Sequence, residues 1–366
     1  MKILIIDNAS VVSVNGLHYT NNLNGLFIEE LVGLGHNLTY FQFFSETTNS
    51  INSFCLEEHK VRCNLVKPHG NKILRYLSAY YYAYRAVKKA DFVYLYYPST
   101  FRFVGFICSL INKPFGLYVR GMKGVEDRTS KALYKRAYTI FTVSDYFTNS
   151  INAYLGKEKT HTIRPMIPYN DYDVVSRGYV KKHKYRILFL GRIDKEKGLV
   201  ELVQAAKVLK SQGYNFVLKV VGDGHFMPEL RKFIKERDVV DYIHLEGPVY
   251  DSNIKAEYYK QADIYILPTY HEGFPRTLYE AMIFGAPIIT TFVGGISALM
   301  KDGYNCLQIE PRSIDSIVDK LSYAMENYDN MGIMAKNASA LVSRIVDKGR
   351  PTHAYQLHEI INVYGK

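Results

Sequence analysis

The chain has few cysteines. Its 366 residues contain four, which form no close pair and show no spacing typical of a metal site: Cys55, Cys63, Cys108 and Cys306. Disulfides persist in oxidising compartments, where cysteines usually come in clustered sets. We therefore expect reduced thiols in the core of a cytoplasmic protein, and no bound metal.

Long apolar runs are also lacking. Residues 101–111 fall well short of the roughly 20 residues that span a bilayer. The opening run, residues 3–7, is too short for a secretory signal and predicts a buried first strand instead. The sequence therefore predicts neither a transmembrane segment nor a cleaved leader.

Acidic residues are in the minority. Asp and Glu number 35 against 46 Lys and Arg, a net charge of +11. Residues 1–175 hold 20 basic and 13 acidic residues, a net of +7, which leaves +4 for the remainder. Such a surface suits nucleic acid, anionic lipid or a phosphorylated substrate. No nucleic-acid-binding motif accompanies the charge, so we expect one of the latter two partners.

Tyrosines cluster in residues 76–89. Tyr76, Tyr80 and Tyr84 fall on one stripe of a predicted helix, and Lys88 and Lys89 follow them. Such a stripe more often packs in a core. The other interpretation is an interfacial helix on the inner face of the cytoplasmic membrane. Both remain open at the level of the sequence.

Strand-like and helix-like segments alternate along the whole chain, which predicts an α/β fold with doubly wound parallel sheets. The expected strands of the first half are residues 3–7, 37–44, 92–97, 115–120 and 139–144. Those of the second half are residues 186–190, 216–221, 242–249, 262–268 and 287–291. Prolines and a charge run at residues 165–185 suit a linker. We therefore predict two domains, residues 1–175 and 176–348.

One glycine turn carries a cluster of cations. Residues 186–190 predict a buried strand, and after Gly191 come Arg192, Lys195 and Lys197. Apolar positions at helical spacing follow in residues 199–210. Anions bind favourably at helix N-termini, and the guanidinium fork grips phosphate oxygens in pairs. The pattern favours a diphosphate site, although a solvated basic loop would look similar.

Two carboxylates flank the turn of residues 271–280. Glu272 lies in a stiff loop after a predicted strand, and Glu280 lies in the helix that follows. Ligands of open parallel sheets bind where such loops meet helix N-termini. Both carboxylates could face one ligand with several hydroxyls. The alternative is that they only complement the helix dipole.

Together these features resemble a known family. Arg192 with Lys197, the Gly-Asp-Gly turn at residues 222–224, Glu272 with Glu280, and the glycine pair at residues 294–295 follow the order and spacing of retaining glycosyltransferases of family GT4. The resemblance is strong over residues 185–310 and loose in the first half. It implies the GT-B fold, in which two Rossmann-like domains face a central cleft. It also implies that residues 349–366 form a helix that crosses back to the N-terminal, acceptor-binding domain.

The resemblance assigns roles to residues. It implies that Arg192 and Lys197 hold the donor diphosphate, that Glu272 binds the donor sugar and that Glu280 binds the ribose. Arg120 would face the cleft from the first domain as a further catalytic residue that steadies the leaving phosphate or the acceptor. The alternative for Arg120 is a structural ion pair. The other expected donor-binding residues are Gly16, Gly191, Gly222, Gly247, Val249, Gly273, Phe274, Pro275, Thr277 and Leu278. Pro275 has no amide hydrogen to contribute.

By this resemblance the chain would transfer a hexosyl-type sugar, with retention, from a UDP- or GDP-sugar to a hydroxyl of a glycan or lipid-linked acceptor. Envelope, capsular or lipopolysaccharide synthesis is the expected setting. No Asp-x-Asp site stands in a suitable loop, so we expect no metal and no other cofactor. Two alternatives remain: a nucleotide-sugar epimerase of the same fold, and a non-catalytic partner that binds a glycan.

Overall fold

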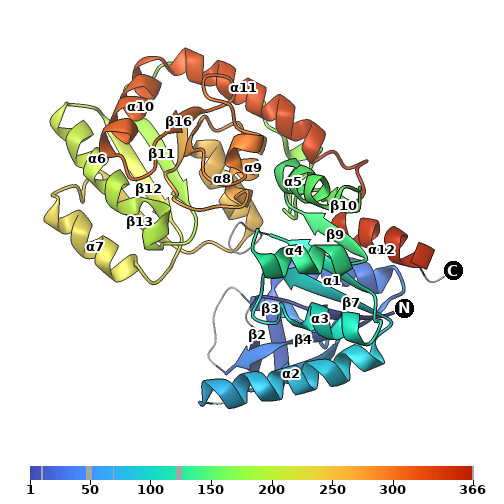
Figure 1. The fold of residues 1–366 in the computed structure, drawn as a ribbon. Helices are drawn as coiled ribbons and strands as arrows, with labels where there is room; N and C mark the ends of the chain where they lie inside the picture. Colours follow the sequence, from blue (N-terminus) through green and yellow to red (C-terminus); the bar gives the residue numbers. More distant parts are fainter. Residues whose placement is uncertain (10, 47–51, 69, 121–125, 365–366) are drawn as a thin grey trace. The chain divides into compact units, whose positions relative to one another are not determined.

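The computed structural model describes residues 1–9, 11–46, 52–68, 70–120 and 126–364 (Figure 1). The chain divides into two compact units. The first contains Met1–Met166 and Pro351–Lys366, and the second contains Ile167–Arg350. The predicted boundary between residues 175 and 176 thus falls inside the second unit.

The first unit is built on one sheet with the strand order β10-β9-β8-β7-β1-β4-β2-β3-β5, and β6 pairs with β4. The strands are β1 (Lys2–Ile6), β2 (Val11–Val14), β3 (Leu17–Asn21), β4 (Asn37–Ser45), β5 (Asn52–Cys55), β6 (Arg62–Val66), β7 (Phe92–Tyr97), β8 (Phe115–Val119), β9 (Thr139–Thr142) and β10 (Thr160–Thr162). The helices are α1 (Asn22–Gly33), α2 (Lys72–Lys89), α3 (Val104–Leu110), α4 (Arg128–Arg136), α5 (Asp145–Leu155) and α12 (His353–Tyr364).

Strand β1 shows why helices cover both faces of this sheet. Its side chains alternate between faces, as in any strand. Leu4 and Ile6 pack with residues of α2, α3 and α4, whereas Ile3 and Ile5 pack with residues of α1 and α12. The apolar run therefore belongs to a strand that is buried on both sides, the pattern of a doubly wound parallel sheet.

Strands β2 and β3 form a hairpin that the sequence prediction did not include. They pair antiparallel, with Val14 opposite Leu17. The tip is Asn15 and Gly16, whose φ angles are 51° and 80°. Positive φ at both central residues is what a two-residue hairpin turn requires, and Asn-Gly supplies it with little strain.

Helix α12 belongs to the first unit although it ends the chain. His353 is buried, and its Nε2 lies 2.5 Å from the Tyr94 hydroxyl. Burial, together with nearby Arg120, lowers the pKa of His353 to about 3. Further along the helix, His358 Nδ1 lies 2.9 Å from His36 Nε2. The imidazoles of His353 and His358, together with apolar side chains, thus dock this helix.

The second unit contains a six-stranded, fully parallel sheet with the order β13-β12-β11-β14-β15-β16. Its strands are β11 (Tyr185–Leu190), β12 (Phe216–Val221), β13 (Ile243–Gly247), β14 (Ile264–Leu267), β15 (Ile288–Thr291) and β16 (Leu307–Ile309). Its helices are α6 (Leu199–Ser211), α7 (Met227–Glu236), α8 (Ser252–Gln261), α9 (Arg276–Ile283), α10 (Ile314–Glu326) and α11 (Tyr328–Ile345), with short 3₁₀ turns η1 (Asp171–Asp173), η2 (Lys195–Lys197) and η3 (Ile296–Ala298). This is the Rossmann order, which reverses direction between its first and fourth strands.

Helix α2 does not bury the tyrosines expected on its core face. Its buried residues are Ala79, Ala83, Ala86 and Val87. Tyr76 and Tyr80 flank that strip, and Tyr84 is exposed. Small side chains let this helix lie close to the sheet. Among the described residues, no helix is both long and apolar enough to cross a membrane.

Candidate functional site

The candidate site lies where the strand order of the second unit's sheet reverses, between β11 and β14. β11 and β14 are parallel neighbours, with Ile187 opposite Ile264. Residues 191–198 follow the carboxyl end of β11, and residues 268–275 follow that of β14. Ligands of open α/β sheets bind in the crevice at this point. The topology therefore brings the cation-rich turn after β11 and the Glu272 loop after β14 to the same edge of the sheet.

The two loops are joined by hydrogen bonds. The Tyr270 backbone N–H donates to the Glu196 carbonyl at 2.8 Å, and the Thr269 hydroxyl donates to the same oxygen at 3.3 Å. The Thr291 hydroxyl in turn donates to the Thr269 carbonyl at 2.7 Å. These contacts fix the loops relative to each other, so the side chains they carry are held in place.

Lys197 and Glu272 meet at the centre of this edge. The Lys197 ammonium forms a short ion pair with Glu272 Oε1. Their side chains are only 12% and 19% exposed. A cation and an anion are thus placed side by side in a partly dehydrated position, where each is available to a polar ligand.

Arg192 has a different environment. Its side chain is 77% exposed, and its Nη1 lies 3.1 Å from Asp194 Oδ2. Lys195 is also exposed, with its ammonium over the Phe226 ring at 5.7 Å. Of the three cations in the predicted diphosphate loop, the structure brings only Lys197 onto Glu272.

Three glycines shape the loop because backbone segments approach each other closely. A Cβ on Gly222, whose φ is +146°, would lie 1.9 Å from the Gly191 carbonyl oxygen. One on Gly224 would lie 2.3 Å from the Ile193 carbonyl oxygen. One on Gly198 would lie 2.0 Å from the Pro268 carbonyl oxygen. The Gly-Asp-Gly turn therefore supports the residue 191–193 turn directly.

Two helices begin at this edge without side-chain caps. Gly198 precedes α6 and Pro275 precedes α9, and neither residue accepts a hydrogen bond through its side chain. The first-turn N–H groups of a helix have no intrahelical acceptors, and the helix dipole adds positive potential there. Both helix starts are suited to an anion.

Glu280 lies inside the unit, in α9. It is 5% exposed, and the Tyr259 hydroxyl donates to its Oε2 at 2.8 Å. Burial raises the pKa of Glu280, and Lys255, Tyr259 and Arg276 oppose that rise. A carboxylate kept here against its desolvation cost is typical of a functional position.

The other predicted donor-binding residues fall into two groups. Phe274 and Leu278 are buried, and the Phe274 ring lies 4.4 Å from that of Tyr279, so these two side chains serve the core. The Gly273 carbonyl accepts from Gly295 N–H at 2.8 Å, which ties in the predicted glycine pair. The rest are half-buried, except buried Pro275, and stand at the end of β13, in the loops after β11, β12, β13 and β14, or at the start of α9: Gly191, Gly222, Gly247, Val249, Pro275 and Thr277.

Tyrosines at the base of the site were missed from the sequence. Tyr265 is buried on β14, its hydroxyl lies 3.4 Å from the Leu190 carbonyl, and it also bonds the Thr277 side chain. Burial, aided by Glu280 and Glu272, raises the pKa of Tyr265. This hydroxyl therefore links β11, β14 and α9. Within an apolar strand a tyrosine resembles any core residue, so no local signal marked it.

Arg120 and Gly16 belong to the first unit. Arg120 follows β8, its Nη1 lies 3.2 Å from Asn8 Oδ1, and it lies over the Tyr96 and Tyr118 rings at 5.5 and 5.6 Å. Its pKa is raised, because Tyr118 and Asp7 outweigh the effect of burial. Gly16 stands at the tip of the β2–β3 hairpin. Arg120 is thus held at the carboxyl edge of its own sheet.

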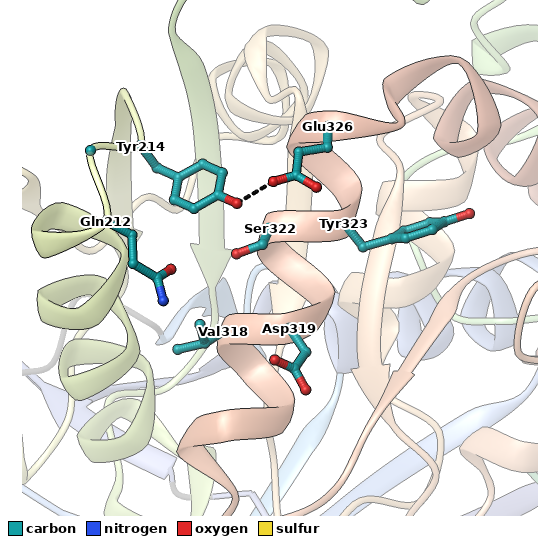
Figure 2. Close-up of a pocket in the computed structure, with 8 residues that line it drawn as sticks. Gln212, Tyr214, Val318, Asp319, Ser322, Tyr323 and Glu326 are labelled. Atoms are coloured by element: carbon teal, nitrogen blue, oxygen red, sulfur yellow. Dashed lines mark hydrogen bonds between the residues drawn. The ribbon is translucent and has the colours of Figure 1, made fainter.

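A surface hollow of about 750 Å³ opens elsewhere in the second unit, between residues 212–214 and α10 (Figure 2). The Tyr214 hydroxyl donates to Glu326 across it. Tyr214 precedes β12, so the hollow lies at the amino end of that strand. The carboxyl ends carry the Lys197 and Glu272 loops, and the hollow is not part of that site.

Comparison with known proteins agrees with this geometry. Residues 176–340 match the family described as Glycosyl transferases group 1. A 2-deoxystreptamine N-acetyl-D-glucosaminyltransferase from Niallia circulans is 31% identical over 144 residues, which are 39% of this chain and 37% of that protein. The capsular polysaccharide biosynthesis glycosyltransferase CapM of Staphylococcus aureus is 30% identical over 36% of this chain and 34% of its own length.

The match to these curated relatives thus spans little more than a third of their length. Among solved structures, Anabaena HepE in complex with UDP and glucose aligns with a TM-score of 0.70 over 100% of both chains, at 16% identity. WaaG, a glycosyltransferase involved in lipopolysaccharide biosynthesis, aligns at 0.66 over 100% of both chains, at 14% identity. The fold is therefore that of the GT-B glycosyltransferases. Over residues 176–340 the chain is similar to the glycosyl transferases group 1 family.

Proposed function

We propose that the protein is a retaining glycosyltransferase that moves a hexosyl-type sugar from a UDP- or GDP-sugar to a hydroxyl of a glycan or lipid-linked acceptor. The observation that carries this proposal is the Lys197–Glu272 pair at the β11–β14 switch point, beside the uncapped starts of α6 and α9. A cation and two helix starts suit the diphosphate, and a carboxylate that accepts hydrogen bonds suits the sugar hydroxyls.

In this proposal Lys197 and the helix starts stabilise the negative charge that grows on the departing diphosphate. Preorganised charge of this kind acts most strongly where water is partly excluded. Glu272 accepts hydrogen bonds from the donor sugar, and Glu280 accepts them from the ribose. Arg192, which is exposed, reaches the outer phosphate oxygens. The scheme places no metal or other cofactor in the transfer step.

The relatives support the proposed setting without defining the acceptor. CapM is named for capsular polysaccharide biosynthesis, AmsK of Erwinia amylovora for amylovoran biosynthesis and WaaG for lipopolysaccharide biosynthesis. HepE is solved with UDP-glucose as well as with UDP. A UDP-sugar donor and a cell-envelope glycan acceptor are therefore the first pair to supply.

An exposed face of α2 supports contact with an anionic membrane. At about 100° per residue, five of its six exposed large apolar side chains share an outward arc of about 100°: Ile73, Leu74, Leu77, Tyr81 and Tyr84. Tyr82 lies outside this arc. The helix contains five cations and no acidic residue: Lys72, Arg75, Arg85, Lys88 and Lys89. Apolar side chains flanked by cations suit the interface of an anionic leaflet. We propose that this face docks the enzyme where lipid-linked acceptors reside, at the inner face of the cytoplasmic membrane.

A transfer assay tests the proposed activity. The protein is incubated with UDP-glucose, UDP-N-acetylglucosamine or GDP-mannose, alone and with lipid-linked glycan acceptors, and products are analysed by NMR. The proposal predicts an acceptor-dependent product that keeps the anomeric configuration of the donor. An isomerised sugar from donor alone would instead indicate the epimerase. Binding of a glycan without donor turnover or nucleotide binding would indicate the non-catalytic partner.

A further inference from the structure

A second polar cluster lies in the first unit, away from the Lys197 and Glu272 loops of the second unit. Its members are His18 on β3, Glu57 just after β5 and Cys63 on β6. The His18 Nδ1, a Glu57 carboxylate oxygen and the Cys63 Sγ all lie within 4.8 Å of one another. Nothing in the proposed transfer reaction uses these groups.

The backbone holds the three residues rigidly. β3 and β5 pair antiparallel, with Tyr19 opposite Cys55, and β6 pairs parallel with β4, with Cys63 opposite Tyr40. The Leu56 N–H donates to the His18 carbonyl at 2.9 Å. The His18 backbone N–H donates to Glu57 Oε2, also at 2.9 Å. His18 and Cys63 thus lie on paired strands, which keep the geometry of a site better than a free loop does, and the His18 backbone anchors Glu57 in the turn after β5.

Imidazole, carboxylate and thiol are a chemically specific combination. Zn²⁺ binds nitrogen, oxygen and sulfur ligands at roughly 2.0–2.3 Å, which places the ligand atoms of a tetrahedral site about 3.3–3.8 Å apart. The 4.8 Å cluster needs only small side-chain rotations to reach that spacing. The side chains of His18 and Glu57 are 21% and 32% exposed, so an ion can enter from solvent.

Charge supports a cation at this position. His18 Nδ1 lies 2.6 Å from Glu57 Oε1, so a proton now bridges two groups that could both ligate a metal. Cys55 adds a second thiol, with its Sγ 3.8 Å from Glu57 Oε2. A divalent cation would replace the bridging proton and neutralise the carboxylate and thiolate together.

We propose that His18 Nδ1, Glu57 and Cys63 Sγ bind one zinc-type divalent cation, with Cys55 or water as a fourth ligand. The ion ties the β2–β3 hairpin to the β5–β6 segment and is structural. On binding, the ligands release protons to solvent, and no electron is transferred. Such a site would differ from the expectation from the sequence that all four cysteines are core thiols in no metal-type arrangement, because strand pairing joins ligands whose spacing is not local.

Metal titration of the full-length protein tests the proposal. After treatment with a chelator, the protein is titrated with Zn²⁺ against a chromophoric competitor, and with Co²⁺ while its absorption spectrum is recorded. We expect one equivalent of Zn²⁺, release of protons on binding, and a Co²⁺ spectrum with intense tetrahedral bands and a thiolate charge-transfer band. Loss of an outer-shell partner weakens metal sites by about 10- to 100-fold. Cys63→Ser and His18→Gln should weaken Zn²⁺ binding by more than that.

Cys108→Ala is the matched control, because Cys108 is a buried thiol of the same unit outside the cluster. It should bind Zn²⁺ as the unaltered chain does. UDP binding and circular dichroism confirm that each variant is folded. Absence of stoichiometric Zn²⁺ binding in the unaltered protein, or equal affinity in Cys63→Ser and His18→Gln, would overturn the proposal. Neither result bears on Lys197 and Glu272, which are in the other unit.

Discussion

Lys197 and Glu272 show at the scale of single residues how the second unit prepares for a charged ligand. Their side chains lie in separate loops and form one ion pair at the edge of the sheet. A diphosphate would compete with Glu272 for the Lys197 ammonium, which releases the carboxylate to the sugar hydroxyls. The Lys197 ammonium can thus bind the diphosphate while the Glu272 carboxylate binds the sugar.

Replacing Lys197 tests its proposed role in the transition state. We expect Lys197→Met to lower kcat by about 10²- to 10³-fold, the typical loss of one preorganised donor, with a smaller change in donor affinity. Steady-state kinetics with the preferred donor measure both. Lys195→Met is the control, because that ammonium is exposed and lies outside the ion pair. Equal losses in the two variants would contradict the assignment.

Gly222 provides a test of backbone packing under the site. Alanine there would meet the Gly191 carbonyl oxygen and would have to adopt a φ of +146°. Strain of this kind costs about 1–3 kcal/mol, so Gly222→Ala should lower the free energy of unfolding by that amount and weaken nucleotide binding. Chemical denaturation measures the first effect. Gly178→Ala, with nothing within 4 Å of the added Cβ, should leave both unchanged.

The burial of Glu280 should make the stability of the fold depend on pH. Burial raises its folded pKa above the value of 4.5 that an unburied Glu has. The folded state then holds a proton that the unfolded state has lost, so this residue's contribution to stability falls as pH rises from 4.5 through the folded pKa. Glu280→Gln removes that loss. The variant should match the unaltered protein near pH 4 and exceed it near pH 7, in thermal unfolding followed across pH.

The same Glu280→Gln variant should bind nucleoside diphosphate more weakly, since an amide presents one acceptor oxygen to the ribose where a carboxylate presents two. A variant that is more stable but binds its ligand more weakly indicates that the original residue serves function and lowers the stability of the fold. A variant that gained no stability at neutral pH, or bound nucleotide undiminished, would show that Glu280 has another role.

At the scale of elements, the most regular segments could be predicted from the sequence. β7 lies at Phe92–Tyr97 as expected, because its six residues are all buried and their apolar run is unbroken. Weakly patterned elements could not be predicted. β2 is short and half-buried, and α11 has no side-chain cap and contains Gly332. Helix α11 depends on tertiary contacts, such as the Ser339 hydroxyl donating to the Met282 carbonyl at 2.9 Å.

The loops of the candidate site could also be predicted from the sequence, but their contact with each other could not. The loops carrying Lys197 and Glu272 are marked by glycine, proline and charge, which are local signals. Their pairing depends on β11 lying beside β14, which spacing alone does not determine. Tyr259 forms a hydrogen bond with Glu280, and Tyr265 forms one with Thr277. In the sequence, however, these two tyrosines are ordinary aromatic residues of a helix and a strand.

Helix α2 carries the prediction about membrane contact. The full-length protein should sediment with vesicles that contain phosphatidylglycerol and remain free with pure phosphatidylcholine vesicles, since both apolar burial and charge contribute. Leu77, which is 65% exposed, lies in the middle of the apolar arc. Leu77→Glu should therefore reduce sedimentation strongly.

Ile333→Glu is the control for that experiment, because Ile333 is 60% exposed on α11 in the second unit. It should sediment as the unaltered protein does. Equal sedimentation of the Leu77→Glu variant, or binding that ignores lipid charge, would contradict docking through α2.

At the scale of the whole molecule, each unit is a complete α/β sandwich with its own core. The second unit holds most of the residues proposed for the donor, and the first holds Gly16, Arg120, the helix α2 proposed to contact the membrane, and the proposed cation site. The chain begins in the first unit and returns to it through α12. This division allows donor binding to be measured separately from acceptor binding and transfer.

Calorimetric titration of the full-length protein with UDP, GDP and ADP, in the presence of a chelator, tests the central claim most directly. The account predicts selective binding of one nucleoside diphosphate without divalent metal, and much weaker binding by Glu280→Ala. Absence of binding for all three nucleotides would contradict a diphosphate site built on Arg192 and Lys197, and would favour a non-catalytic protein that binds a glycan.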